Sequence, residues 1–237
     1  MPVLAYSQRV KPLNLPKYDM VKLHFGMALG INNMGAQVQL SDNFFALDSI
    51  YSAECNPQYG FNINIVANFN LNKYFSVRFL PGLNFGQRNM EYIVYSQKTD
   101  EFSKKIMEIE STYLDFPLLF QLKAARLNNF RAYVIGGLSY KLDLSSQKKI
   151  SDEEKPRIRF KPNVFSYEVG VGTDFFLQYF KFSIEAKMSF ALNNVLVQDD
   201  SQYSSSMQSL SPQMLNITVL FEGSDVEGLN FLKWFSK

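Results

Sequence analysis

Five charged residues of this chain could form an acid–base centre, because they are three carboxylates and two cations on segments of similar pattern. They are Arg78, Asp115, Glu168, Glu185 and Lys187. A carboxylate beside a cation or another carboxylate can act as a general acid or base. The expected pairs are Asp115 with Arg78, and Lys187 with Glu168 or Glu185. If these segments close around a filled interior, the same side chains form a structural ion network, because buried charges require partners. A filled interior admits no substrate, so we favour the structural network and expect no catalytic residue.

The single histidine, His24, and the single cysteine, Cys55, offer little further chemistry. One cysteine allows neither an intrachain disulfide nor a thiolate metal cluster. Enzymes that modify membrane lipids can use a histidine beside a serine and an acid, at the outer rim or on the lipid face. His24 is expected near the opposite end, packed or hydrogen-bonded. The sequence contains no glycine-rich phosphate loop, zinc-ligand spacing or nucleophile elbow, so we expect no cofactor and no metal.

The segment that carries Glu185 and Lys187 has the pattern of an amphipathic strand. Residues 180–190 read FKFSIEAKMSF, with an apolar residue at every even position and a polar one at every odd position. Successive side chains of a strand point to opposite faces, so this segment has one apolar and one polar face. A helix would mix the two sets, because its period is 3.6 residues. About eleven residues of tilted strand also suffice to cross a bilayer.

Seven further segments alternate in the same way. They are residues 20–31, 59–69, 74–86, 112–123, 130–144, 164–176 and 213–222. The polar segments between the eight strands are alternately long and short, as in outer-membrane barrels with short periplasmic turns and long external loops. The sequence therefore predicts an all-β fold, an eight-stranded antiparallel up-and-down transmembrane β-barrel. Pro81 lies within one predicted strand and is expected to mark a bulge or bend. Residues 93–95 could extend a hairpin beyond the membrane.

The two faces of the strands differ in a way that indicates which one is inside. The apolar face carries no charged residue on any predicted strand, as contact with lipid would require. A soluble barrel with an apolar ligand cavity would exclude charge from that face as well. The polar face, however, is rich in glycine and serine, and an eight-stranded barrel has an interior only wide enough for side chains to fill. We therefore expect the apolar face to point outward, into lipid.

Composition limits the remaining classes of function. The 237 residues include 15% aromatics, which suits the aromatic girdles of membrane barrels, and no run approaches 18 apolar residues. The net charge of +2, without a basic stripe, argues against binding to nucleic acid.

We divide the chain into a signal-peptide remnant and periplasmic lead-in (1–19), an outer-membrane barrel (20–222) and a C-terminal periplasmic tail (223–237). The tail carries an apolar group that could dock on a partner or on the membrane: Phe231, Leu232, Trp234 and Phe235.

Several segments together resemble a known family. They read KLHFGMALGIN, FLPGLNFGQR, YLDFPLLFQLK, RAYVIGGLSYKL, SYEVGVGTDF and AKMSFALNNVL. They are similar to the small outer-membrane β-barrel proteins of Bacteroidetes and, within these, to the PorT family of the type IX secretion system. The resemblance implies a non-enzymatic component needed to export cargo with C-terminal sorting domains, such as proteases and adhesins. It also implies partners among the other type IX components, with the large translocon barrel as one candidate, and it supplies no catalytic residue.

Two other functions stay open on the sequence. One is a general small barrel for envelope integrity or adhesion, which works through its loops. The other is a lipid A-modifying enzyme, in which His24 would be essential. Outer-membrane lipid and lipopolysaccharide are expected partners in each case, and the basic residues between Lys148 and Lys161 could contact lipopolysaccharide phosphates.

Overall fold

The structure is a computed structural model that describes residues 12–41, 50–96, 101–145, 159–197 and 206–223. Within these residues, no helix is both long and apolar enough to span a membrane.

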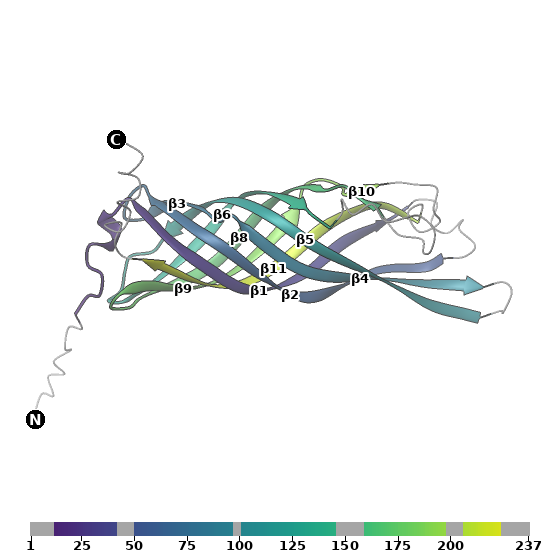
Figure 1. Ribbon diagram of the computed structural model, residues 1–237, viewed down its shortest axis with the longest axis horizontal. Coiled ribbons are helices and arrows are strands. Elements are labelled where there is room, and N and C mark those ends of the chain that lie inside the picture. Colours follow the sequence, from purple (N-terminus) through teal and green to yellow (C-terminus); the bar gives the residue numbers. More distant parts are fainter. Residues whose placement is uncertain (1–11, 42–49, 97–100, 146–158, 198–205, 224–237) are drawn as a thin grey trace, which may run out of the picture.

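Eight long strands close into a single barrel (Figure 1). Each pairs antiparallel with its neighbours along the chain, and the first pairs with both the second and the last, which closes the ring. The strands are β1 (Leu23–Leu40), β2 (Ile50–Asn70), β3 (Phe75–Phe79) with β4 (Gly82–Ser96) as two halves of one strand, β5 (Glu101–Lys123), β6 (Phe130–Asp143), β8 (Asn163–Phe176), β9 (Phe180–Ala191) and β11 (Met207–Gly223). The predicted all-β, eight-stranded, up-and-down barrel is confirmed.

Short elements lie at the two ends of the barrel. A 3₁₀ turn, η1 (Tyr18–Met20), precedes β1 at the end where the short connections lie, which we call the turn end. At the other end, the loop end, β7 (Arg159–Phe160) pairs with β10 (Leu196–Val197). The sequence predicted only loops at β7 and β10, because two-residue strands have no readable period.

Pro81 interrupts the third wall of the barrel, as predicted. The backbone leaves the regular ladder at Leu80 and Pro81, between β3 and β4, and both halves still pair with β2 and β5. The Ile65 N–H donates to the Pro81 carbonyl at 2.9 Å, so the bend keeps its hydrogen bond to β2. Proline removes a ladder donor, and the chain accommodates this loss at a break in the strand.

The apolar face of the barrel points outward, as expected. On β2, Ile63 and Ile65 are 50% and 64% exposed, while Asn62 and Asn64 beside them are buried in the lumen. The same alternation runs through β5, β6, β8 and β9. Apolar side chains exposed in this regular pattern are those that contact lipid in a membrane barrel.

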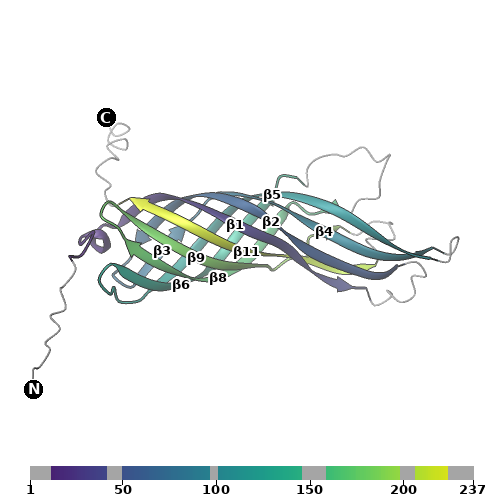
Figure 2. The ribbon, with the colours of Figure 1, turned by 90° about the horizontal axis from the view of Figure 1, so that it is seen from below.

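Five strands are longer at the loop end than the sequence predicted. Residues 32–58 were interpreted as a polar loop, but β1 continues to Leu40 and β2 begins at Ile50. Residues 87–111 are mostly the hairpin of β4 and β5, as the apolar residues 93–95 suggested, and β11 begins at Met207. A bulge between Pro57 and Phe61 shifts the register of β2, so the alternation changes phase and hides the strand. The hairpin projects beyond the other described strands (Figures 1 and 2).

Two neighbouring glycines of β6 provide a matched test of wall packing. A Cβ on Gly137 would lie 2.1 Å from the Leu118 carbonyl oxygen, whereas one on Gly136 would lie 3.7 Å from its nearest neighbour, the Glu168 carbonyl oxygen. We therefore expect Gly137→Ala to lower the free energy of unfolding by about 1–3 kcal/mol, and Gly136→Ala to change it by less than about 1 kcal/mol. Denaturant unfolding of both variants in one detergent measures the difference. Equal stability of the two variants would contradict this packing of β6 against β5.

Candidate functional site

A cluster of buried charges fills the lumen near the turn end. Arg78 of β3 forms ion pairs with Glu185 of β9 at 2.7 Å and with Glu222 of β11 at 3.3 Å. Lys181 of β9 lies 2.9 Å from the same Glu222 carboxylate and 3.5 Å from Asp174 of β8. All five side chains are almost fully buried, so each charge is compensated by neighbours rather than by water.

The segment before β1 covers this cluster at the turn end of the barrel. The Tyr18 hydroxyl donates to Glu222 at 2.8 Å, and its ring stacks on His24 with 3.9 Å between centroids. Asp19 pairs with Arg131 at 2.7 Å, and Arg131 also pairs with Asp174 at 2.9 Å. The lead-in therefore forms part of the lumen packing, a role that the sequence did not predict because residues 12–20 show no periodicity.

Arg126 holds the same segment against the rim of the turn end. Its guanidinium donates to the backbone carbonyls of Asn14 and Leu15 and lies 3.7 Å from the centroid of the Phe176 ring. Asn129 accepts from the Asn14 N–H at 2.9 Å. A guanidinium that stacks on a ring while it donates to several acceptors is held in one geometry. The described residues 12–20 thus form a cap on the turn end.

A second group of charges lies further along the lumen. Glu168 of β8 pairs with Lys141 of β6 at 2.7 Å and with Lys187 of β9 at 2.6 Å. Asp115 of β5 accepts from Ser139 and from Asn84, and one of its oxygens lies 3.9 Å from the Lys141 ammonium. The two carboxylates and the two lysines balance in charge, so the group is self-compensated.

The structure places all five sequence-predicted network residues in the lumen, but it groups them differently. Glu168 does meet Lys187, whereas Arg78 contacts Glu185 and Glu222, and Asp115 lies beside Lys141 instead of Arg78. The expected pair of Asp115 with Arg78 is therefore wrong. Several further charged residues, which were not among the five predicted, belong to the network: Arg131, Lys141, Asp174, Lys181 and Glu222. Each lies on the polar face of a predicted strand, so the alternation was a signal that could have identified it.

Apolar side chains fill the lumen at the loop end. They come from β1, β2, β4, β5, β8 and β11, and from the short pair β7 and β10 that lies over them. The buried members are Met34, Ala53, Met90, Tyr92, Tyr113, Val164, Val195, Leu196, Met207, Leu210 and Met214. Backbone bonds fix the short pair in place, since Val195 donates to the Leu210 carbonyl and Lys161 donates to the Val195 carbonyl. The two ends of the lumen are thus packed in different ways.

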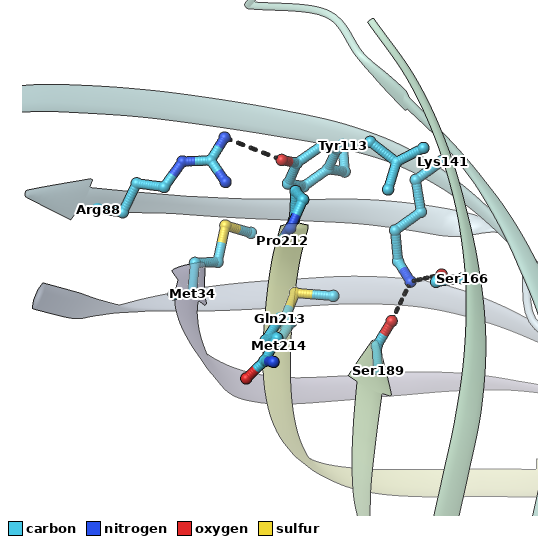
Figure 3. A pocket seen from close by; sticks show the side chains of 11 residues that line it. Met34, Arg88, Tyr113, Lys141, Ser166, Ser189, Pro212, Gln213 and Met214 are labelled. Carbon is cyan, nitrogen blue, oxygen red and sulfur yellow. Dashed lines mark hydrogen bonds between the residues drawn. The ribbon is translucent and has the colours of Figure 1, made fainter. Parts of the chain in front are cut away.

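A small cavity lies between the apolar cluster and the charges below it (Figure 3). Its volume is about 20 Å³, which suffices for roughly one water molecule. Lys141 donates to Ser166 and Ser189 at its edge, and the Arg88 guanidinium donates to the Tyr113 hydroxyl. The space is too small for an organic substrate.

His24 of β1 packs against the cap rather than lying at a reactive surface. It is 1% exposed, and its Nε2 lies 3.0 Å from the Tyr18 carbonyl oxygen. Among the residues that the structure describes, no group of three or more His, Cys, Asp or Glu side chains is arranged to hold a metal ion. The apolar tail residues Phe231, Leu232, Trp234 and Phe235, and the basic segment up to residue 158, lie outside the described residues.

Tyr18 provides a test of the cap through pH. Burial first, and then the Glu222 carboxylate, raise the pKa of the Tyr18 hydroxyl well above its ordinary value. The folded protein therefore keeps this proton where the unfolded chain loses it, so stability falls as the pH rises above about 10, the ordinary pKa of tyrosine. We expect Tyr18→Phe to have a smaller loss of unfolding free energy than the wild type between about pH 9 and about pH 11. Urea unfolding in detergent at both pH values measures it. Identical losses in the two proteins would show that Tyr18 is not held in the cap.

A closed barrel with an apolar outer face and a lumen filled with ion pairs defines a class of membrane protein, the small outer-membrane barrels. A comparison with protein families agrees: the family described as "Outer membrane protein beta-barrel domain" matches residues 7–197. The chain belongs to this family, and the protein is an integral β-barrel of the outer membrane. A comparison with curated proteins finds no match.

Several solved structures of outer-membrane proteins are similar to this chain. AlkL, determined by solid-state NMR in lipid bilayers, is 12% identical over 95% of this chain and 98% of its own, with a TM-score of 0.48. OprG from Pseudomonas aeruginosa is 10% identical over 85% of this chain and 91% of its own, with a TM-score of 0.41. Ail from Yersinia pestis, solved with the heparin analogue sucrose octasulfate, is 12% identical over 85% of this chain and 99% of its own, with a TM-score of 0.38.

Proposed function

We propose that this protein is a non-enzymatic outer-membrane component of the type IX protein secretion system, needed to export cargo with C-terminal sorting domains. The observation that supports a surface role is the packing of the lumen. Ion pairs fill its middle, residues 12–20 cap the turn end, and the apolar cluster fills the loop end. The described residues leave a solute or a polypeptide no route through the lumen, which favours the two ends and the lipid-facing wall as the working surfaces. The specific choice of the type IX system rests on the resemblance of the strand motifs to the PorT family.

The short connections suggest how the barrel is oriented. Outer-membrane barrels place their short turns in the periplasm and their long loops outside the cell. We assign the turn end, with the cap, the start of β1 and the end of β11, to the periplasm, and the loop end to the cell surface. In this orientation the tail that contains Phe231, Leu232, Trp234 and Phe235 is available to other secretion components, such as the large translocon barrel.

Deletion of the gene in the native host tests the export role. We expect cargo with C-terminal sorting domains to disappear from the medium and cell surface and to accumulate in the periplasm, and wild-type protein supplied in trans to restore it. Normal secretion in the deletion strain would refute the proposal. If secretion is normal and permeability or surface binding changes instead, the protein is a general envelope or adhesion barrel. If the deletion changes the lipid A mass spectrum, and a strain with only the His24→Ala variant shows the same change, the protein is a lipid-modifying enzyme.

A truncation separates the tail from the barrel. A chain that ends after Gly223 retains all the described strands and is expected to fold, to reach the outer membrane and to lose export if the tail docks on a partner. Full export by this variant would remove the tail from the proposal and leave the barrel surfaces.

A further inference from the structure

Among the described residues, β5 has an unpaired edge where the hairpin projects. β5 pairs with β4 from Glu101 to Asp115, but its pairing with β6 on the other side extends only from Tyr113 to Lys123. No described residue forms a ladder with β5 between Phe102 and Glu110 on that side. An open edge presents a row of main-chain donors and acceptors, and these can template the addition of another strand.

The register shows which residues face the open edge. The Leu144 N–H donates to the Thr112 carbonyl and the Ala124 N–H donates to the Ala132 carbonyl, so even-numbered residues of β5 point their main-chain groups toward β6. The odd-numbered Lys123 donates to Tyr74, on the other side. The N–H and C=O groups of successive residues point to alternate sides of a strand. Five residues therefore each present an N–H and a C=O to the open edge. These residues are Phe102, Lys104, Ile106, Glu108 and Glu110.

The opposite edge of the same sheet differs in its regularity. Upper β2 pairs with β4 and not with β1, but its register shifts between Ile50 and Ser52 and again between Pro57 and Phe61. Bulges and prolines are among the devices by which proteins protect an edge against added strands. The β5 edge has neither device, since its register with β4 is unbroken from Glu101 to Asp115. Of the two edges, only the one on β5 remains suitable for pairing.

The side chains beside this edge lie outside the lipid band. The outward residues of β5 change from apolar, ending at Leu114, to the exposed Glu110 and Glu108. Beyond these carboxylates lie Ile106 and Phe102, which are 52% and 64% exposed. The apolar tip is thus separated from the membrane-facing wall by charged residues, which lipid contact does not explain.

An aromatic group completes the tip of the hairpin. The centroid of the Phe102 ring lies 5.2 Å from the ring centroids of both Tyr51 and Tyr95. Lys104 forms a 2.7 Å ion pair with Glu91 on β4, so its ammonium is directed away from the open edge. Together these contacts give the outward face an apolar end at Phe102 and Ile106 and an acidic end at Glu108 and Glu110.

We propose that the open edge of β5 binds an extended segment of a partner protein as an added β-strand. Main-chain hydrogen bonds to residues 102–110 supply the affinity, and the side chains beside the edge supply the preference. The preferred segment has apolar residues next to Phe102 and Ile106 and a basic residue next to Glu108 or Glu110. This binding does not depend on the export role, because it follows from the edge alone.

Amide hydrogen exchange of the free protein tests whether the edge is open. With the full chain in detergent micelles, the amides of Phe102, Lys104, Ile106 and Glu108 are expected to exchange fast, and the odd-numbered amides between them to exchange slowly. Slow exchange at the even positions in a monomer would show that the chain covers its own edge, and would overturn the proposal. Protection of these amides in a dimer would assign the edge to a second copy, and would also overturn it.

A defined probe tests strand addition. We would titrate the full chain with a fluorescent peptide of about eight residues that alternates valine and threonine and ends in lysine, and with its N-methylated counterpart. The unmodified peptide is expected to bind and to protect the even-numbered amides, and the N-methylated one to fail. No binding, or equal binding of both peptides, would contradict strand addition.

Two substitutions at one position separate main-chain pairing from side-chain contact. Ile106→Pro removes an N–H that faces the open edge and leaves the pairing to β4 intact, whereas Ile106→Thr keeps the N–H and a β-branched side chain. We expect the proline variant to bind the peptide about tenfold more weakly or worse, and the threonine variant to bind nearly as the wild type does. Equal loss in both variants, or no loss in either, would refute pairing through this amide.

Discussion

Replacing Glu168 with leucine is expected to lower the free energy of unfolding by about 3–5 kcal/mol, one of the two largest effects that we predict. Glu168 is fully buried and is the ion-pair partner of both Lys141 and Lys187, at 2.7 and 2.6 Å. Leucine removes the close ion-pair partner of both buried ammonium groups, and it leaves Lys141 with Asp115 at 3.9 Å. Urea unfolding of the purified barrel in lipid vesicles measures the loss.

A second substitution in the same background tests whether uncompensated charge is the cause. Lys187→Leu added to Glu168→Leu restores charge balance, with Asp115 and Lys141 left as a pair. We expect the double variant to be more stable than Glu168→Leu alone, because non-additive recovery is the signature of groups that interact directly. Further destabilisation by the second change would mean that packing, and not charge, dominates at this position.

Replacing Glu222 with leucine is expected to have an effect of similar size, about 3–5 kcal/mol, at the other end of the network. This carboxylate pairs with Arg78 and Lys181 and accepts a hydrogen bond from the Tyr18 hydroxyl, so its removal takes away one of the contacts that hold the cap on the barrel. We therefore expect two results from one variant: a lower unfolding free energy, and faster amide exchange in residues 18–20. The measurement combines urea unfolding with hydrogen exchange followed by mass spectrometry.

A surface carboxylate provides the control for the Glu222 variant. Glu91 forms a 2.7 Å ion pair with Lys104, but the pair lies on the exposed face of the hairpin. Exposed ion pairs contribute little, so Glu91→Leu should leave stability nearly unchanged. If Glu222→Leu were as mild as this control, the lumen charges would not hold the barrel together.

Most of the barrel was predictable from alternation because lipid and lumen impose opposite chemistry on successive residues. The segment at residues 180–190 corresponds to β9 within one residue. The strands failed to be recognised where they leave the membrane, since the outward face of β1 beyond residue 32 and of upper β2 no longer has to be apolar. The bulge near Pro57 then removes the remaining period.

The lumen charges were predictable as a set but not as pairs. Alternation places Asp115 and Glu168 on the inner face, yet which charges meet depends on the stagger between strands and on which walls face each other across the lumen. Arg78 and Glu185 are 107 residues apart in sequence and meet across the barrel at 2.7 Å. The cap could not be predicted from the sequence for a different reason. Tyr18 and Asp19 belong to an irregular segment that has no period, and their contacts are known only from the structure.

The packing of the described lumen indicates a closed barrel, and we propose that it acts through its surfaces. Electrical recording of the purified, refolded protein in a planar lipid bilayer tests it most directly. We expect insertion to produce no conductance steps above the baseline, because the charges, the cap and the apolar cluster leave no continuous aqueous path among the described residues. Reproducible steps from the wild-type protein would show an open channel and would refute a closed lumen.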